Sequence, residues 1–158
     1  MAKGLSVPES ELSYSNEIDD LSHHERVSVL PPKELALSAL TVCIEQKAHD
    51  PCAIELTEGN DVADYFVLAS ATSERHARGI ADNIQRTLKA EGETPTHVAG
   101  YEDSTWIVLD YGDVVIHVFH EPVRRYYDLD GLWGDAPRLP LAPELHEQVK
   151  KLRTGMFY

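Results

Sequence analysis

Residues 105–119 read TWIVLDYGDVVIHVF, and this stretch decides the kind of fold that the chain can adopt. Two apolar runs, residues 105–110 and 114–119, flank a short polar sequence that contains a glycine. Apolar runs of this length on either side of a tight turn are typical of a β-hairpin. We therefore predict two paired strands that join at Tyr111 and Gly112.

Three further stretches favour strands. Residues 65–70 (YFVLAS) form a nearly unbroken apolar run, as expected of a strand covered on both faces of a sheet. Residues 52–56 (CAIEL) predict another strand, and a short one is predicted near His97. Together with the hairpin, these stretches predict a sheet of five strands.

Apolar side chains at helical spacing predict helices between the strands. One helix is predicted from Lys33 to His49, with Asp50-Pro51 as its stop signal. Another is predicted to begin after a cap at Thr72 or Ser73 and to end at Gly92.

Two more helices are predicted after the hairpin. Pro122 opens one of them, and residues 144–153 predict a short basic helix. The order of the elements predicts an α/β fold, a mixed five-stranded sheet flanked by helices.

The charge of the chain bears on its partners. It has 14 basic and 27 acidic residues, a formal charge of -13. Because nucleic-acid affinity comes largely from Lys and Arg that displace counterions, we expect no direct nucleic-acid readout and a protein partner instead. No run of about 18 apolar residues occurs, so no membrane span is predicted. Cys43 and Cys52 lie outside metal-ligand spacing and indicate a reducing compartment.

The chain divides into three predicted segments. Residues 1–31 predict an acidic, mostly disordered tail with a short helix around Ser10 to His24. The acidic character of the tail is the wrong sign for a secretory signal or a transit peptide, so neither is expected. Residues 32–135 predict the folded domain, and residues 136–158 a C-terminal extension.

Catalysis and metal binding find little support in the residues. Residues 70–76 (SATSERH) join a strand to a helix start, where amides attract anions, but the loop lacks glycine and a P-loop lysine. Asp128 and Asp130 form a close pair, but in a helix their side chains diverge. At the hairpin turn, we favour a turn-stabilising role for Asp113 over a metal site with Asp110. Phosphate or nucleotide binding at the loop of residues 70–76 stays open as an alternative to an ordinary capped helix.

A partner surface accounts for more residues. Strand alternation separates two sets of side chains: Trp106, Val108 and Asp110 on one face, and Ile107, Leu109 and Tyr111 on the other. If Ile107 and Leu109 face the core, Trp106 is exposed on an open sheet, where tryptophan often anchors a partner. The alternative, that Trp106 packs under a neighbouring helix, stays open.

The segment after the hairpin is rich in aromatic and basic side chains. Helical spacing favours the core over an interface for Tyr126, Tyr127 and Trp133. Arg124 and Arg125 are predicted to lie on a solvated face.

Two blocks, residues 62–84 (VADYFVLASATSERHARGIADNI) and 106–133, resemble the ribosomal silencing factor family, also called the Iojap-like family. The resemblance covers about Pro32 to Asp135. It rests on the combination of D-Y-F-V, T-S-x-R-H, D-Y-G-D-V-V-x-H-x-F, R-x-x-Y-x-L and L-W.

The resemblance implies a mixed α/β domain, often a homodimer, with nucleotidyltransferase-like topology that lacks the catalytic carboxylates. It implies no enzymatic activity and no cofactor. It also implies a bacterial cytoplasmic protein that binds the large ribosomal subunit through ribosomal protein L fourteen and blocks joining of the small subunit. Translation is thereby repressed when nutrients are scarce. The alternatives are a role in large-subunit assembly and a residual nucleotidyltransferase-like enzyme.

The family's docking face is carried over to this chain residue by residue. Trp106 is the expected anchor with Val108 beside it, and the other matching positions are Asp110, Tyr111, Gly112, Asp113, Thr72, Ser73, Arg75 and His76. The chain departs from the family pattern at three places: Ser70-Ala71 replaces Thr-Gly, Ala99-Gly100 replaces Glu-Gly, and Glu55 replaces an aspartate.

Overall fold

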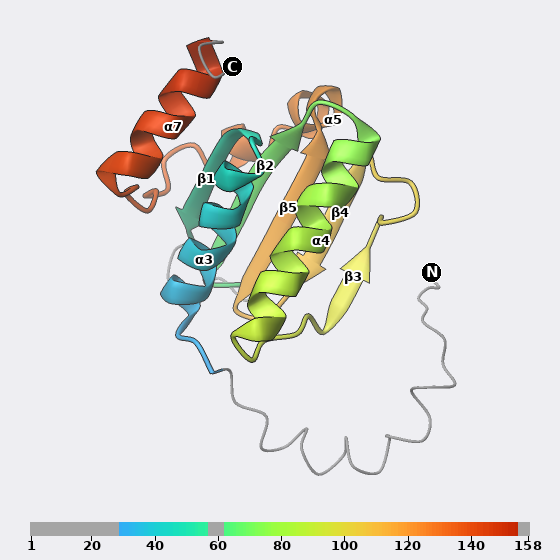
Figure 1. The fold of residues 1–158 in the computed structure, drawn as a ribbon, viewed down its shortest axis with the longest axis vertical. Helices are drawn as coiled ribbons and strands as arrows, with labels where there is room; N and C mark the ends of the chain where they lie inside the picture. Colours follow the sequence, from blue (N-terminus) through green and yellow to red (C-terminus); the bar gives the residue numbers. More distant parts are fainter. Residues whose placement is uncertain (1–28, 57–61, 155–158) are drawn as a thin grey trace.

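Five strands form one sheet whose order in space differs from their order in the chain (Figure 1). The structure is a computed structural model that describes residues 29–56 and 62–154, so the helix predicted around Ser10 to His24 lies outside the described residues. The strands are β1 (His49–Glu55), β2 (Tyr65–Ala71), β3 (His97–Ala99), β4 (Trp106–Asp110) and β5 (Val114–His120).

The strand pairing makes the sheet mixed. Its order is β1-β2-β5-β4-β3. Strands β2 and β5 run parallel, whereas β1–β2, β4–β5 and β3–β4 are antiparallel pairs. The predicted fold class, a mixed five-stranded sheet flanked by helices, is confirmed.

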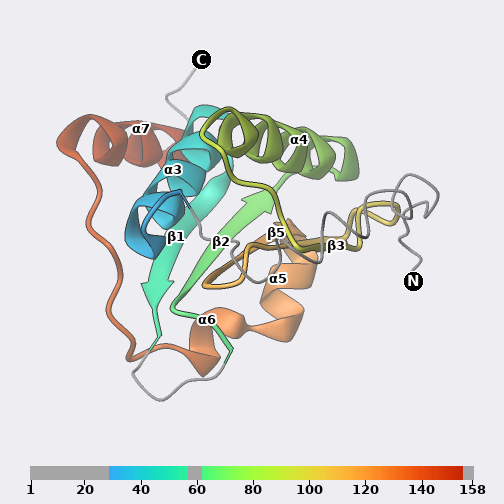
Figure 2. The same cartoon turned by 90° about the horizontal axis from the view of Figure 1, so that it is seen from below.

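Helices cover the two faces of the sheet unequally (Figure 2). On one face lie α3 (Pro32–Glu45) and α4 (Glu74–Ala90), with α7 (Pro143–Thr154) beside α3. On the other face lie two short helices, α5 (Glu121–Tyr127) and α6 (Leu129–Leu132). Within the described ranges, no helix is long and apolar enough to cross a membrane.

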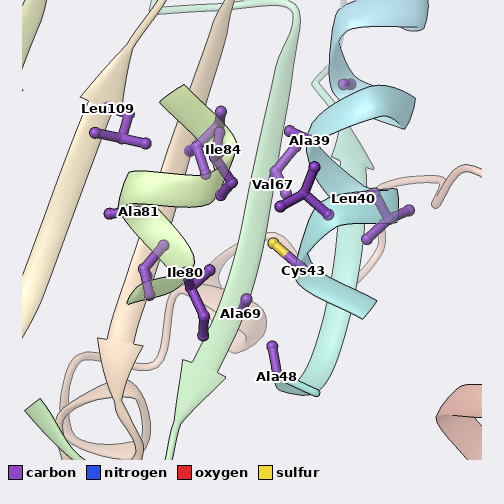
Figure 3. Close-up of a cluster of buried hydrophobic side chains, with 14 of the residues drawn as sticks. Ala39, Leu40, Cys43, Ala48, Val67, Ala69, Ile80, Ala81, Ile84 and Leu109 are labelled. Carbon is purple, nitrogen blue, oxygen red and sulfur yellow. The ribbon is translucent and has the colours of Figure 1, made fainter. Parts of the chain in front are cut away.

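The main core lies between the sheet and the helices α3 and α4 (Figure 3). On α4 the buried side chains are those that helical spacing predicted: Ala77, Ile80, Ala81, Ile84 and Leu88. Cys43 of α3 lies in the same core, where burial raises the pKa of its thiol to about 12. The thiol therefore stays protonated and packs as a small apolar side chain.

Ser73 caps α4, as the sequence predicted. Its Oγ accepts a hydrogen bond of 2.9 Å from the backbone N–H of His76. We expect Ser73→Ala to lower the free energy of unfolding by about 1 kcal/mol, because this N–H loses its acceptor. Urea unfolding followed by circular dichroism measures the change. Ser73→Asp keeps an acceptor and should keep the stability, and equal midpoints for all three proteins would contradict the role of the cap.

The first helix ends earlier than predicted, at Glu45 and not at His49. Lys47 has a φ of 63° and Asp50 a φ of 47°, a left-handed backbone that an α-helix does not contain. Asp50-Pro51 lies within β1, so its assignment as the helix stop was wrong. The helix is instead followed by a turn ahead of Asp50-Pro51, in which the N–H of Lys47 donates to the carbonyl of Ile44.

The segment after residue 135 packs on the sheet and on α3. Arg138 forms a bridge with Ile54, and the N–H of Leu139 donates to the carbonyl of Ala53 over 2.9 Å. Leu139 is buried in the main core. This segment therefore covers the outer edge of β1, which would otherwise present unpaired backbone groups.

Candidate functional site

Alternation along β4 sends its side chains to different environments. Ile107 and Leu109 are fully buried in the main core, which settles the choice of face that the sequence left open. Trp106 and Val108 lie on the opposite face and are half-buried. The apolar side chains of α3 and α4 are buried only if the sheet presents an apolar face to them. The face of β4 with Ile107 and Leu109 is therefore the buried one.

Trp106 combines the two environments that the sequence left open. Its ring stacks on Phe119 at a centroid distance of 5.0 Å, and the ring of Tyr127 from α5 lies 4.7 Å away. Its Nε1–H donates to Nδ1 of His117 over 3.0 Å. Trp106 is therefore packed on one side by a helix and reached by solvent on the other.

A groove of about 350 Å³ lies between β4 and α5. Its lining residues are Thr105, Trp106, Pro122, Val123, Tyr126 and Tyr127. We call this surface the aromatic groove. It is shallow and largely apolar, which suits a protein side chain better than a charged cofactor.

The prediction that Tyr126 and Tyr127 belong to the core was wrong. Tyr126 is 81% exposed and Tyr127 52% exposed, and their rings meet edge to face at 5.0 Å. The helix α5 has only seven residues and buries Arg124, whereas Tyr127 covers one side of the Trp106 ring and Tyr126 stays in solvent. Trp133 is half-buried, with its ring against Phe66.

His117 lies beneath the aromatic groove and is 7% exposed. Since its Nδ1 accepts from Trp106, its proton belongs on Nε2, which has no hydrogen-bond partner within the described ranges. Burial lowers the pKa of His117 to about 4. The imidazole is therefore neutral at physiological pH.

Acidification should destabilise the fold through His117. Its pKa is lower in the folded chain than in the unfolded chain, so the unfolded chain binds more protons between the two values. We expect this group to remove about 2 kcal/mol of stability between roughly pH 7 and pH 5. Urea unfolding of wild type and His117→Asn across this range measures the difference, since the variant lacks the imidazole. Identical pH slopes for the two proteins would contradict this assignment.

The hairpin turn is held by Asp110 and not by Asp113, so the turn-stabilising role was assigned to the wrong carboxylate. Oδ1 of Asp110 accepts a 2.8 Å hydrogen bond from the N–H of Gly112, which has a φ of 90°. Asp113 is exposed, and its backbone carbonyl accepts from the N–H groups of Asp64 and Tyr65. The turn needs an acceptor that points back toward its own N–H groups, and Asp110 has that geometry.

Tyr111 lies on the core side of the hairpin. It is 6% exposed, and burial raises the pKa of its hydroxyl well above the ordinary value. Its side chain is therefore not on the same surface as Trp106.

Thr72, Arg75 and His76, at the start of α4, lie in different environments. Arg75 is exposed, and Thr72 is exposed beside His76. The Nδ1 of His76 accepts from the N–H of Thr72 over 3.0 Å, and its Nε2 donates to the carbonyl of Gln46 over 2.8 Å. His76 thus ties the start of α4 to the end of α3.

The strand register separates the predicted docking residues along the sheet. Trp106 and Ser70 both pair with Phe119, so the aromatic groove and the loop before α4 lie at the same end of the sheet. Asp110 pairs with Val115 at the opposite end. The hairpin turn and Trp106 therefore belong to different ends of the strand pair.

Arg124 is buried and not solvated, contrary to prediction, whereas Arg125 is exposed as predicted. Arg124 lines a polar pocket of about 530 Å³ and pairs with Asp130. Asp128 instead accepts from the N–H of Gly131, so the two carboxylates have separate partners. In the parts of the chain that the structure describes, no group of three or more His, Cys, Asp or Glu could hold a metal ion.

The fold and the aromatic groove define a mixed α/β domain that presents aromatic side chains on the thinly covered face of its sheet. Comparison with known proteins gives the family. The family model described as "Ribosomal silencing factor during starvation" matches residues 30–155, which extends beyond Asp135, where we ended the resemblance. This chain belongs to the ribosomal silencing factor family, as the sequence motifs indicated.

Individual relatives agree with this assignment. "Ribosomal silencing factor RsfS" of Halalkalibacterium halodurans is 35% identical over 109 residues, which are 69% of this chain and 93% of that protein. A crystal structure of a Chromobacterium violaceum protein has a TM-score of 0.64 at 27% identity and covers 72% of this chain and 95% of its own. "Mitochondrial assembly of ribosomal large subunit protein 1" of Mus musculus is 29% identical over 56% of this chain and 40% of that protein.

Proposed function

We propose that this chain binds the large ribosomal subunit through ribosomal protein L fourteen and sterically blocks joining of the small subunit. The observation that carries the docking step is the aromatic groove, where Tyr126 and Tyr127 are exposed beside the half-buried Trp106. Exposed aromatic side chains around a shallow apolar groove are the usual anchors of a protein interface. The names of the relatives supply the ribosome as the assembly to test.

The charge of the chain supports a protein as the landing place. A formal charge of -13 opposes close contact with ribosomal RNA, whereas basic ribosomal proteins attract an acidic partner. The chain then needs no direct nucleic-acid readout. Binding to a protein component also places the molecule at one defined position on the subunit.

The proposed effect is a lower rate of translation when nutrients are scarce. Steric blocking needs occupancy and no turnover, so the proposal requires neither an enzymatic reaction nor a cofactor. It places the chain in the bacterial cytoplasm, where ribosomal subunits join.

Sedimentation tests this function directly. Purified large subunits are mixed with the chain and then with small subunits, and the joined ribosomes are separated on a gradient. We expect the chain to co-sediment with the large subunit and to reduce the joined fraction. Binding to isolated protein L fourteen tests the contact itself. Full joining at saturating concentrations of the chain would refute the steric mechanism.

A second candidate, a role in large-subunit assembly, is favoured by the name of the mouse relative. It differs from silencing in its timing. An assembly factor should associate with immature large subunits and leave finished ones, whereas a silencing factor should bind finished subunits. Quantifying the chain across gradient fractions from growing and starved cells separates the two.

We also propose that the chain forms a homodimer. Leu132 of α6 is 70% exposed and is not a lining residue of the aromatic groove, so it offers a second copy an apolar contact apart from the docking residues. Sedimentation equilibrium gives the molecular mass in solution. A monomer mass at all concentrations up to those used for ribosome binding would exclude the dimer.

A further inference from the structure

The hydrogen bond beneath the aromatic groove joins side chains from two neighbouring strands. Trp106 pairs with Phe119 in the β4–β5 register, and His117 pairs with Val108, so the Trp106 and His117 side chains lie diagonally on one face. Their Nε1 and Nδ1 atoms are 3.0 Å apart. The imidazole is thus the polar contact that the indole makes with its own sheet.

The indole of Trp106 is held from three directions. Phe119 stacks against it with an interplanar angle of 28°, and Tyr127 approaches at 42° from α5. Stacking alone allows the ring to slide or to turn over, because apolar contact has little directionality. The hydrogen bond to His117 selects one rotamer and one orientation of the ring.

A histidine at this position has a cost that an apolar residue would avoid. Its Nε2–H is buried without a partner among the described residues, and Phe66 meets the imidazole edge to face at 4.8 Å. An unpaired buried donor lowers stability. What the histidine contributes in return is the Nδ1 acceptor, which a leucine or phenylalanine could not provide.

We propose that His117 is a positioning residue for partner docking, whose Nδ1 holds the Trp106 indole in the orientation that the partner meets. This inference rests on the proposed docking at the aromatic groove. An anchor that already has its bound orientation loses less conformational entropy on binding, so the effect is on affinity. His117 itself touches no partner in this arrangement.

Two substitutions of nearly equal shape test the acceptor. In His117→Asn the amide Oδ1 takes the place of the imidazole Nδ1, so this variant retains an acceptor, whereas His117→Leu has the same branching without one. The experiment uses the full chain with Trp133→Phe as the background, which leaves one indole N–H signal. Thermal unfolding of each variant confirms that it is folded.

The first readout is the indole N–H of Trp106 in the free protein, by proton–nitrogen NMR. We expect a downfield, slowly exchanging signal in the background protein and in His117→Asn. In His117→Leu the signal should move upfield and exchange faster, because the acceptor is gone. This measurement does not involve the ribosome.

The second readout is the affinity for purified large subunits. We expect His117→Leu to bind about tenfold more weakly and His117→Asn to stay within about threefold of the background. Trp106→Phe keeps the stacking ring but loses the donor, so it should resemble His117→Leu. Adding His117→Leu to Trp106→Phe should then weaken binding little further.

The outcomes separate the two proposals. If the background protein binds large subunits and His117→Leu binds equally well, the positioning role is overturned while the docking function stands. If equal losses occur in His117→Asn and His117→Leu, the acceptor is not what matters and the role is likewise overturned. If the background protein does not bind large subunits, the proposed function fails, and the docking role of His117 fails with it.

Discussion

Arg124→Met should lower the free energy of unfolding by about 2–3 kcal/mol, because it removes the buried hydrogen bonds of the guanidinium and leaves the carboxylate of Asp130, 33% exposed, without its partner. Nε and Nη2 of Arg124 donate to the two oxygens of Asp130 over 2.9 and 2.7 Å. Its Nη1 donates to the carbonyl of Asp50 over 2.7 Å and to Oγ of Ser70 over 3.1 Å. One guanidinium therefore joins α5, α6, β1 and β2.

The neighbouring arginine provides a matched control for this substitution. Arg125 is exposed, so Arg125→Met should change the free energy of unfolding by about 0.5 kcal/mol or less. Methionine replaces much of the length of either side chain, so a difference between the two variants reports the buried contacts. Urea unfolding at neutral pH measures both, and equal midpoints would show that the Arg124–Asp130 pair contributes little.

Trp106→Ala should weaken binding to the large subunit by about 2 kcal/mol or more, roughly thirtyfold. The substitution removes one of the aromatic rings that line the aromatic groove. It also removes the ring contact with Phe119, so some loss of folding stability accompanies the loss of affinity. Affinity must therefore be measured well below the unfolding temperature of the variant.

The control for Trp106→Ala is an exposed apolar residue on the other face of the sheet. Val98 of β3 pairs with Leu109, whose side chain points into the main core, so Val98 lies on the side away from the aromatic groove. Val98→Ala should leave the affinity unchanged. Wild-type affinity in folded Trp106→Ala would remove Trp106 from the docking surface, and an equal loss in Val98→Ala would show that the effect is not local.

The strands and the main helices were predictable because the hydrophobic pattern of each segment matches the burial that the fold gives it. The run at residues 65–70 lies in the covered centre of the sheet, and the face of α4 with Ile80 and Ile84 needs no information beyond its spacing. Gly92 ends the same helix with a φ of 92°. In these elements the chemistry of each residue favours one environment: the apolar side chains favour the core, and the glycine favours the positive φ at the helix end.

The failures concern residues whose chemistry suits two environments. An arginine beside an arginine is usually solvated, but Arg124 is buried because Asp50, Ser70 and Asp130, distant in sequence or on the next helix, converge on it. Tyrosines at helical spacing usually pack inward, but Tyr126 of α5 is 81% exposed, and among the described residues only the ring of Tyr127 meets its ring.

The sequence by itself determined the order of the strands and of the main helices along the chain, the mixed α/β class and the family. The tertiary structure decided which face of β4 is buried, because Ile107 and Leu109 pack in the core that α3 and α4 cover. Tertiary structure alone decided that Trp106 rests on His117 and Phe119, and that Asp110 lies at the other end of its strand pair from the aromatic groove. The physical reason is the distance along the chain over which each kind of interaction acts. Hydrophobic periodicity and turn chemistry act over a few residues, whereas a hydrogen bond or ring contact between strands depends on a register that the whole sheet sets together.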